Sequence, residues 1–89
     1  MLKIEQVPVD SMHPDGIKIT DAAGELRPFL SFHTFEAIEP EKVKAAQINA
    51  PVEFEGQIFP NGVFLYRRDD GTLKAETIQA FRAKYYNER

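Results

Sequence analysis

The chain contains no cysteine. This absence excludes a disulfide framework and a thiolate metal site. The chain also has no apolar run close to the roughly 18 residues of a membrane-spanning helix, and its first stretch, MLKIEQVPVD, does not have the layout of a signal peptide. We therefore expect a cytoplasmic protein without a membrane partner.

A large excess of charge of either sign is also missing. The net charge is −3, from 11 basic and 14 acidic side chains. Long-range attraction to nucleic acid or to an anionic membrane is therefore not expected.

The usual parts of an active site are missing as well. The serines, Ser11 and Ser31, lie in no nucleophile elbow. The five glycines are isolated, so no glycine loop is present to bind a phosphate. Glu53 and Glu55 fit a solvated strand face better than an acid–base pair, because a chain of this size rarely builds the cleft that such chemistry needs. We expect no catalytic residues, no cofactor and no enzyme activity.

One loop of the sequence places ionisable side chains close to a histidine. Asp10, His13 and Asp15 lie close together in the sequence and could form a small metal or acid–base site. The simpler interpretation is that they are turn-forming residues on a polar loop. His33, between aromatic residues, fits a partly covered strand position. No metal ligand is predicted, and a small enzyme or metal-binding protein that uses the His13 loop stays a second alternative.

What the chain does contain is the composition of one folded domain. Hydrophobic residues make up 43% and charged residues 28% of its 89 residues, which are ordinary globular values. This length leaves no room for a second core. We expect residues 1–89 to form a single domain.

Hydrophobic periodicity predicts the elements of the first half. Alternating apolar residues predict strands at Leu2–Val7 and Ile17–Thr20. Leu26–Phe35 is less regular, and because Pro28 lacks a ladder donor we predict either an edge strand or an irregular lead into a strand that starts at Phe29. Glu39, Pro40 and Glu41 have the pattern of a helix entry, because proline and acidic residues suit the first turn. We therefore predict a short helix that runs from there to Ile48 and stops at Asn49.

The second half is organised around the stretch Pro51–Gly71. Asn61-Gly62 between two apolar runs predicts a β-hairpin with a two-residue loop. This register pairs Phe59 with Phe64 and Glu55 with Arg68. It makes both faces of the hairpin apolar, with Phe54, Ile58, Val63 and Leu65 on one face and Phe59, Phe64 and Tyr66 on the other.

The C-terminal part is predicted to contain one more strand or helix turn and a final helix. Thr72–Glu76 fits a third strand with Leu73 inward, or the start of the helix. Ile78, Phe81 and Tyr85 follow helical spacing, and Thr77 is a suitable N-cap.

These elements predict a small α+β domain. We expect a twisted antiparallel sheet, or a partly open OB-like barrel, of 5–6 strands. In either form one short helix lies between strands 3 and 4, and a second helix ends the chain.

A hairpin that is apolar on both faces must have its second face covered, by the C-terminal helix or by a partner. Aromatic residues beside arginine are typical of interfaces. We therefore predict a non-catalytic binding or regulatory protein whose partner is another protein or a second copy in a homodimer. The predicted binding residues are Phe59, Phe64, Tyr66, Arg67 and Arg68.

The alternative is a module that binds single-stranded nucleic acid. On an OB-like sheet, bases stack on exposed aromatic rings while cations follow the phosphates. The same hairpin has these residue types, but the negative net charge disfavours this function.

Overall fold

The computed structural model describes residues 1–26, 30–37 and 42–87. This part of the chain forms two five-stranded sheets and a single α-helix. Sheet A has the strand order β3-β2-β1-β6-β7. Its strands are β1 (Leu2–Gln6), β2 (Ile17–Asp21), β3 (Gly24–Leu26), β6 (Val52–Phe54) and β7 (Gln57–Phe59). Sheet B has the order β10-β4-β5-β8-β9. Its strands are β4 (His33–Ala37), β5 (Lys42–Ile48), β8 (Val63–Arg67), β9 (Leu73–Glu76) and β10 (Tyr85–Asn87), and the helix is α1 (Ile78–Lys84).

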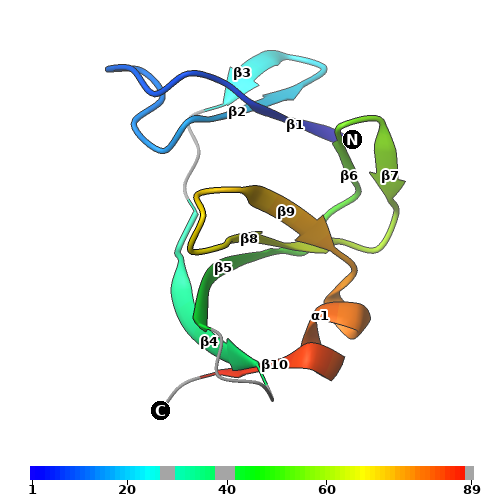
Figure 1. Ribbon diagram of the computed structural model, residues 1–89. Helices are drawn as coiled ribbons and strands as arrows, with labels where there is room; N and C mark the ends of the chain where they lie inside the picture. Colours follow the sequence, from blue (N-terminus) through cyan, green and yellow to red (C-terminus); the bar gives the residue numbers. More distant parts are fainter. Residues whose placement is uncertain (27–29, 38–41, 88–89) are drawn as a thin grey trace.

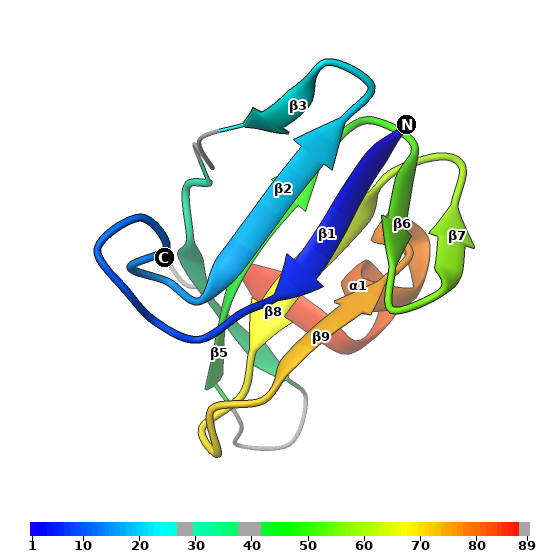
Figure 2. The ribbon, with the colours of Figure 1, turned by 90° about the horizontal axis from the view of Figure 1, so that it is seen from above.

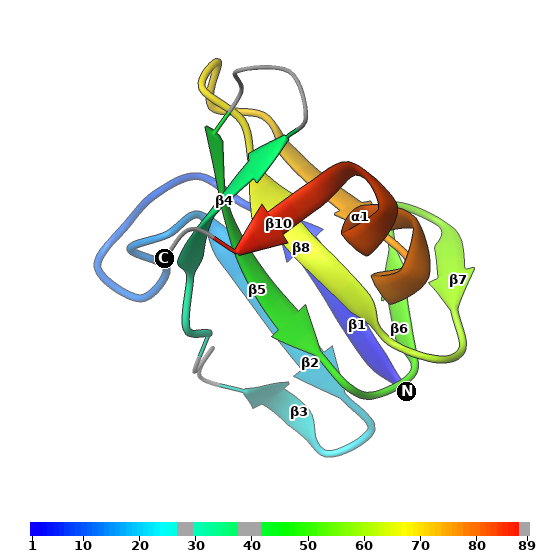
Figure 3. The ribbon, with the colours of Figure 1, turned by 90° about the horizontal axis from the view of Figure 1, so that it is seen from below.

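The elements are stacked in three layers (Figure 1). Sheet A forms one outer layer, which Figure 2 shows face-on. Sheet B lies in the middle, and α1 lies against its other face (Figure 3). Among the described strands, β1 and β6 pair in parallel and every other pair is antiparallel.

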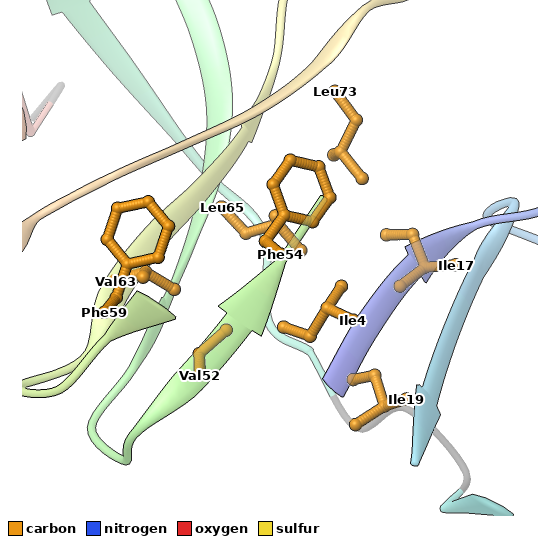
Figure 4. Close-up of a cluster of buried hydrophobic side chains, with 9 residues drawn as sticks. All are labelled: Ile4, Ile17, Ile19, Val52, Phe54, Phe59, Val63, Leu65 and Leu73. Atoms are coloured by element: carbon orange, nitrogen blue, oxygen red, sulfur yellow. The ribbon is translucent and has the colours of Figure 1, made fainter. Parts of the chain in front are cut away.

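The main core lies between the two sheets. Figure 4 shows its nine buried side chains converging from both layers. Sheet A contributes Ile4, Ile17, Ile19, Val52, Phe54 and Phe59, and strands β8 and β9 of sheet B contribute Val63, Leu65 and Leu73. Burial of this apolar surface is the dominant favourable term in folding.

A second core lies on the opposite face of sheet B. Val43 and Ala45 of β5 and Phe64 and Tyr66 of β8 pack there against Phe81 and Tyr85. Phe81 is 0% exposed. The C-terminal helix therefore covers the second apolar face of β8.

The expected fold class is correct in part. A small domain with strands and a C-terminal helix is confirmed, whereas the OB-like barrel is wrong, because the described strands form two open sheets. The expected 5–6 strands are too few. The reason is that the chain divides its short strands between two layers, and each layer buries one side of the other.

The predicted helix between strands 3 and 4 is also wrong. Residues Lys42–Ile48 form strand β5, and the expected helix entry at residues 39–41 lies outside the described residues. Val43 and Ala45 face the core under α1, whereas Ala46 is buried on the other face. Pairing with two neighbouring strands outweighs the moderate helix propensity of this segment.

Several predicted elements are confirmed. The strands at Leu2–Gln6 and Ile17–Asp21 are present, and β9 places Leu73 in the core. Of the less regular region predicted at Leu26–Phe35, residues 27–29 lie outside the described residues. Leu26 ends β3, and the observed strand that follows is β4.

The C-terminal helix begins as predicted. Thr77 is its N-cap, because Thr77 Oγ1 accepts a hydrogen bond of 3.1 Å from the backbone amide of Ala80. The helix ends at Lys84, earlier than expected. The following residues form β10, which pairs with β4.

The predicted hairpin at Asn61-Gly62 is wrong. A hairpin forms earlier, between β6 and β7, and it pairs Val52 with Phe59. Glu55 (φ 50°) and Gly56 (φ 81°) are both left-handed, as a two-residue type I′ turn requires. The predicted pairs therefore do not form: Phe59 stays in sheet A, and β8 pairs with β5 and β9 in sheet B.

Because the hairpin forms at a different turn, the side chains that lie on the same face differ from those predicted. Phe59 lies in the inter-sheet core with Val63 and Leu65 instead of beside Phe64. Ile58 is 56% exposed on β7, which is an edge strand. Glu55 accepts a hydrogen bond of 2.7 Å from Gln6 Nε2 instead of facing Arg68.

Asn61-Gly62 instead lies where the chain passes from sheet A to sheet B. Gly62 has a φ of 95°, and a Cβ atom there would lie 2.5 Å from the carbonyl oxygen of Ile48. Glycine is therefore required twice, by the backbone conformation and by the close approach of another strand end.

We expect Gly62→Ala to lower the free energy of unfolding by about 3 kcal/mol, because it adds a clash to the cost of a left-handed alanine. Gly71→Ala is the matched control: Gly71 has a φ of 86° but nothing within 4 Å of its Cβ position, so its cost should be about 1 kcal/mol. Urea unfolding of both variants measures the difference. Equal losses would show that the close approach to Ile48 does not constrain the fold.

Candidate functional site

The predicted binding residues divide into a buried and an accessible group. Phe59, Phe64 and Tyr66 are buried, whereas Arg67 is half-buried and Arg68 is exposed. Their role in partner binding stays a prediction. The structure places the three aromatic side chains inside the fold, so any contact in this region depends on the arginines and on their neighbours.

The aromatic side chains of β8 are covered by rings from the C-terminal segment. The rings of Phe64 and Phe81 stack with centroids 4.3 Å apart, and the rings of Tyr66 and Tyr85 lie 5.7 Å apart. Aromatic pairs at these distances stabilise a fold beyond their buried area. The second face of β8 therefore has an intramolecular cover.

The hydroxyl of Tyr66 is also held within the fold. It donates a hydrogen bond of 3.2 Å to Glu76 Oε1, which also lies 2.7 Å from Lys84 Nζ. Burial raises the pKa of the Tyr66 phenol, and the hydrogen bond from Lys84 to Glu76 raises the pKa of the Lys84 ammonium. Tyr66 therefore stays protonated as a structural donor.

Phe64 and Arg68 should behave in opposite ways on truncation. We expect Phe64→Ala to lower the free energy of unfolding by about 3–5 kcal/mol, as for other large buried aromatic side chains. Arg68→Ala should change it by less than about 0.5 kcal/mol, since Arg68 is exposed. Thermal or urea unfolding checks both, and a mild effect of Phe64→Ala would contradict the role of α1 as the cover.

Arg67 connects the two sheets at one end of the molecule. Its guanidinium donates one hydrogen bond to the carbonyl oxygen of Gly71 and one to that of Asp15, both at 2.8 Å. Gly71 belongs to the turn between β8 and β9, and Asp15 belongs to the loop before β2. Because both acceptors are neutral carbonyl groups, these bonds orient Arg67 without neutralising it.

A cavity of about 800 Å³ lies beside Arg67. We call it the cationic cleft, because four of its lining residues are basic and two are acidic. The lining residues are Asp15, Phe32, Thr34, Lys42, Val43, Lys44, Arg67, Arg68 and Asp69. A local excess of positive charge in a chain of net charge −3 indicates a place for an anionic group.

The centre of this lining is a row of three side chains on neighbouring strands. Thr34 of β4 pairs with Lys44 of β5, which pairs with Arg67 of β8. Residues directly opposite on paired strands lie on the same face. Leu65, two residues before Arg67, belongs to the inter-sheet core, so the row lies on the inner face of sheet B, near the end of the sandwich.

The charges of this row are not balanced within the described residues. Like charges directly opposite each other destabilise a sheet, yet neither Lys44 nor Arg67 forms an ion pair with a described carboxylate. The next residue on the same face of β5, Lys42, pairs with Glu36 at 3.4 Å. The ion pair with Glu36 therefore accounts for the position of Lys42. No ion pair between described residues accounts in the same way for the adjacent positions of Lys44 and Arg67.

Sequence reasoning found the arginines of this cleft but missed Thr34 and Lys44. The available signal was the alternation Lys42-Val43-Lys44, which places both lysines on one face of a strand. Because a helix was predicted for this segment, the alternation was not interpreted as a strand.

The structure brings together two of the three residues that were expected to cluster, Asp10 and His13. Asp10 Oδ1 lies 3.1 Å from His13 Nδ1, whereas the third partner is Glu25 of β3, which contacts His13 Nε2. Asp15 takes part through its backbone carbonyl, which accepts the bond from Arg67. We call the group formed by Asp10, His13 and Glu25 the histidine clasp. Among the described residues, no group of three or more histidine, aspartate and glutamate side chains is arranged to hold a metal ion.

The histidine clasp needs a charged imidazole. A carboxylate only accepts hydrogen bonds, so both ring nitrogens of His13 must carry protons to satisfy Asp10 and Glu25 together. The hydrogen bond to Glu25 raises the pKa of His13. Asp10 also accepts bonds from the backbone amides of His13 and Met12, and the bond from His13 lowers the pKa of Asp10.

No helix in the described part of the chain is long and apolar enough to cross a membrane. No protein-family model, curated protein or solved structure matches this chain. The case for a function therefore depends on the geometry of the cationic cleft and the histidine clasp.

The histidine clasp predicts a pH dependence of stability. Because the pKa of His13 is raised on folding, its contribution is complete below its ordinary pKa of about 6.5 and is lost as the pH rises through the folded-state value. The difference in unfolding free energy between the wild type and His13→Gln should therefore shrink as the pH rises above about 6.5. An NMR titration of the imidazole gives the folded-state pKa directly. A value at or below 6.5 would contradict the clasp.

Proposed function

We propose that this chain is a non-catalytic binding protein that holds an acidic segment of another protein in the cationic cleft. The observation that carries this proposal is the pairing of Lys44 with Arg67 on neighbouring strands, without a described carboxylate that neutralises either one. Such a pair has a cost in the free protein. An acidic partner would remove this cost on binding.

The position of the cleft supports contact with a segment of polypeptide. It lies at an open end of the sandwich, where the half-buried Phe32 adds apolar surface beside the cations. A site with a few placed polar groups and an apolar wall is typical of specific binding. Arg68 is exposed at the same place, so the arginines predicted from the sequence contribute to this contact.

Charge complementarity in this cleft acts at short range. The whole chain carries −3, and exposed charges are screened beyond about 8 Å at physiological salt. The cleft therefore selects a local acidic segment instead of attracting anions from a distance. An electrostatic attraction of such short range is suited to reversible contacts between proteins, which are typical of a regulatory protein.

Binding of single-stranded nucleic acid is supported less well. That function required exposed aromatic rings for base stacking, and Phe59, Phe64 and Tyr66 are buried. The cations of the cleft alone do not provide a stacking surface.

The charge of the cleft can be tested with a fluorescent deca-glutamate peptide as the probe. We expect the wild type to bind it in low salt and Lys44→Glu to weaken binding at least tenfold, because the variant reverses the central charge. Lys3→Glu is the matched control, since Lys3 is exposed on sheet A, away from the cleft lining. Fluorescence anisotropy measures the affinities.

The stability of a neutral variant at the same position provides a second readout. Relief of the like-charge pair should leave the unfolding free energy of Lys44→Gln unchanged, or raise it by a few tenths of a kcal/mol. Absence of peptide binding by the wild type, or equal weakening by Lys3→Glu, would overturn the proposal. Sedimentation without the probe tests whether the partner is a second copy of the chain.

A further inference from the structure

We propose that the row of Thr34, Lys44 and Arg67 binds a phosphoryl group on a side chain of the partner segment. This inference depends on the proposed function and makes it more specific, because it names the group that occupies the centre of the cleft. It is based on the donors of the row, on the orientation of Arg67 and on the charges around them.

The row offers three different donors along one line. Thr34 supplies a hydroxyl, Lys44 an ammonium and Arg67 a guanidinium, from three consecutive strands of sheet B. Neighbouring strands are about 4.8 Å apart, so the three side chains start within about 10 Å of one another. Their polar ends can converge on one anion in the cleft that all three line.

Arg67 is already oriented for such a ligand. The guanidinium has five N–H groups, and its bonds to the carbonyl oxygens of Gly71 and Asp15 use two of them. The remaining N–H groups and the full positive charge are available to an anion. A donor that is held in place before binding loses less conformational freedom when the ligand arrives.

The number and the kinds of donors favour a phosphoryl group over a carboxylate. A carboxylate has two oxygens, whereas a phosphoryl group has three and carries a charge of about −1.5 to −2 at pH 7. Two adjacent cations with one hydroxyl match this larger charge and its third acceptor. Phe32, half-buried in the same lining, can contact the carbon atoms that carry the ester.

The neighbouring charges indicate how the rest of the segment would lie. Arg68 lines the same cleft next to Arg67, so an acidic residue beside the phosphorylated one would lie near it. Asp15 and Asp69 are also in the lining and disfavour an anion outside the central row. The cleft therefore favours a segment in which the acidic neighbour of the phosphorylated residue lies on the side of Arg68.

The test compares three peptides that differ at one position. Each has the same glutamate-containing sequence, with phosphoserine, serine or glutamate at the centre, and fluorescence anisotropy gives its affinity. We expect the phosphoserine peptide to bind at least tenfold more tightly than the serine peptide and more tightly than the glutamate peptide. Lys44→Gln and Thr34→Val should each reduce this preference, whereas Lys74→Gln, an exposed lysine outside the cleft lining, should not.

The remaining outcomes separate this inference from the proposed function. If deca-glutamate binds in a Lys44-dependent manner but phosphoserine gives no preference, the phosphoryl inference is overturned and the proposed function stands. If neither probe binds, both are overturned. Inorganic phosphate that binds as tightly as the phosphopeptide, or a single-stranded oligonucleotide that binds more tightly, would overturn the assignment to a phosphorylated protein segment.

Discussion

The burial of β8 on both of its faces is the constraint on which the rest of the structure depends. Val63 and Leu65 point into the inter-sheet core, and Phe64 and Tyr66 point toward α1. A strand with two apolar faces must lie inside a sheet and between two layers. Sheet A and α1 provide these layers, and the neighbouring strands β5 and β9 satisfy its backbone hydrogen bonds. The helix is short, but without it the ring of Phe64 would face water.

The sequence predicted that both faces of β8 are apolar, but it left open whether the helix or a partner covers the second face, and it placed β8 beside the wrong neighbour. Two stretches, Glu55-Gly56 and Asn61-Gly62, can both adopt the left-handed conformations of a tight turn. Asn-Gly is the stronger pattern in isolation, yet the turn forms at Glu55-Gly56. The choice depends on contacts between distant segments: Gly62 lies against the end of β5, a contact that no local pattern contains. Local patterns therefore predicted the strands better than their partners.

The same limit explains why only part of the candidate site could be predicted. Arg67 and Arg68 stood out because they follow an aromatic strand, whereas Lys44 lay in a segment whose composition suits a helix. Alanine and lysine at these positions have high helix propensity, and only the pairing of β5 with β4 and β8 makes this segment extended. Because β5 was predicted as a helix, Lys44 was not recognised as a residue at the centre of the cleft. The contact of His13 with Glu25 was missed for a related reason, because β3 approaches this loop only in the folded chain.

The strand that organises the fold also positions the proposed site. Leu65 and Arg67 lie on the same face of β8, and between them the environment changes from a closed core to an open cleft. A side chain that continues a buried strand is held by the packing behind it, and Arg67 is further held by two carbonyl groups. Sites supported by rigid elements keep their geometry better than sites on loops. The positive charge beside Lys44, which no described carboxylate pairs with, is therefore held in place by a deeply packed strand. In a flexible loop the same two cations would move apart, whereas here the pairing of β5 with β8 keeps them adjacent.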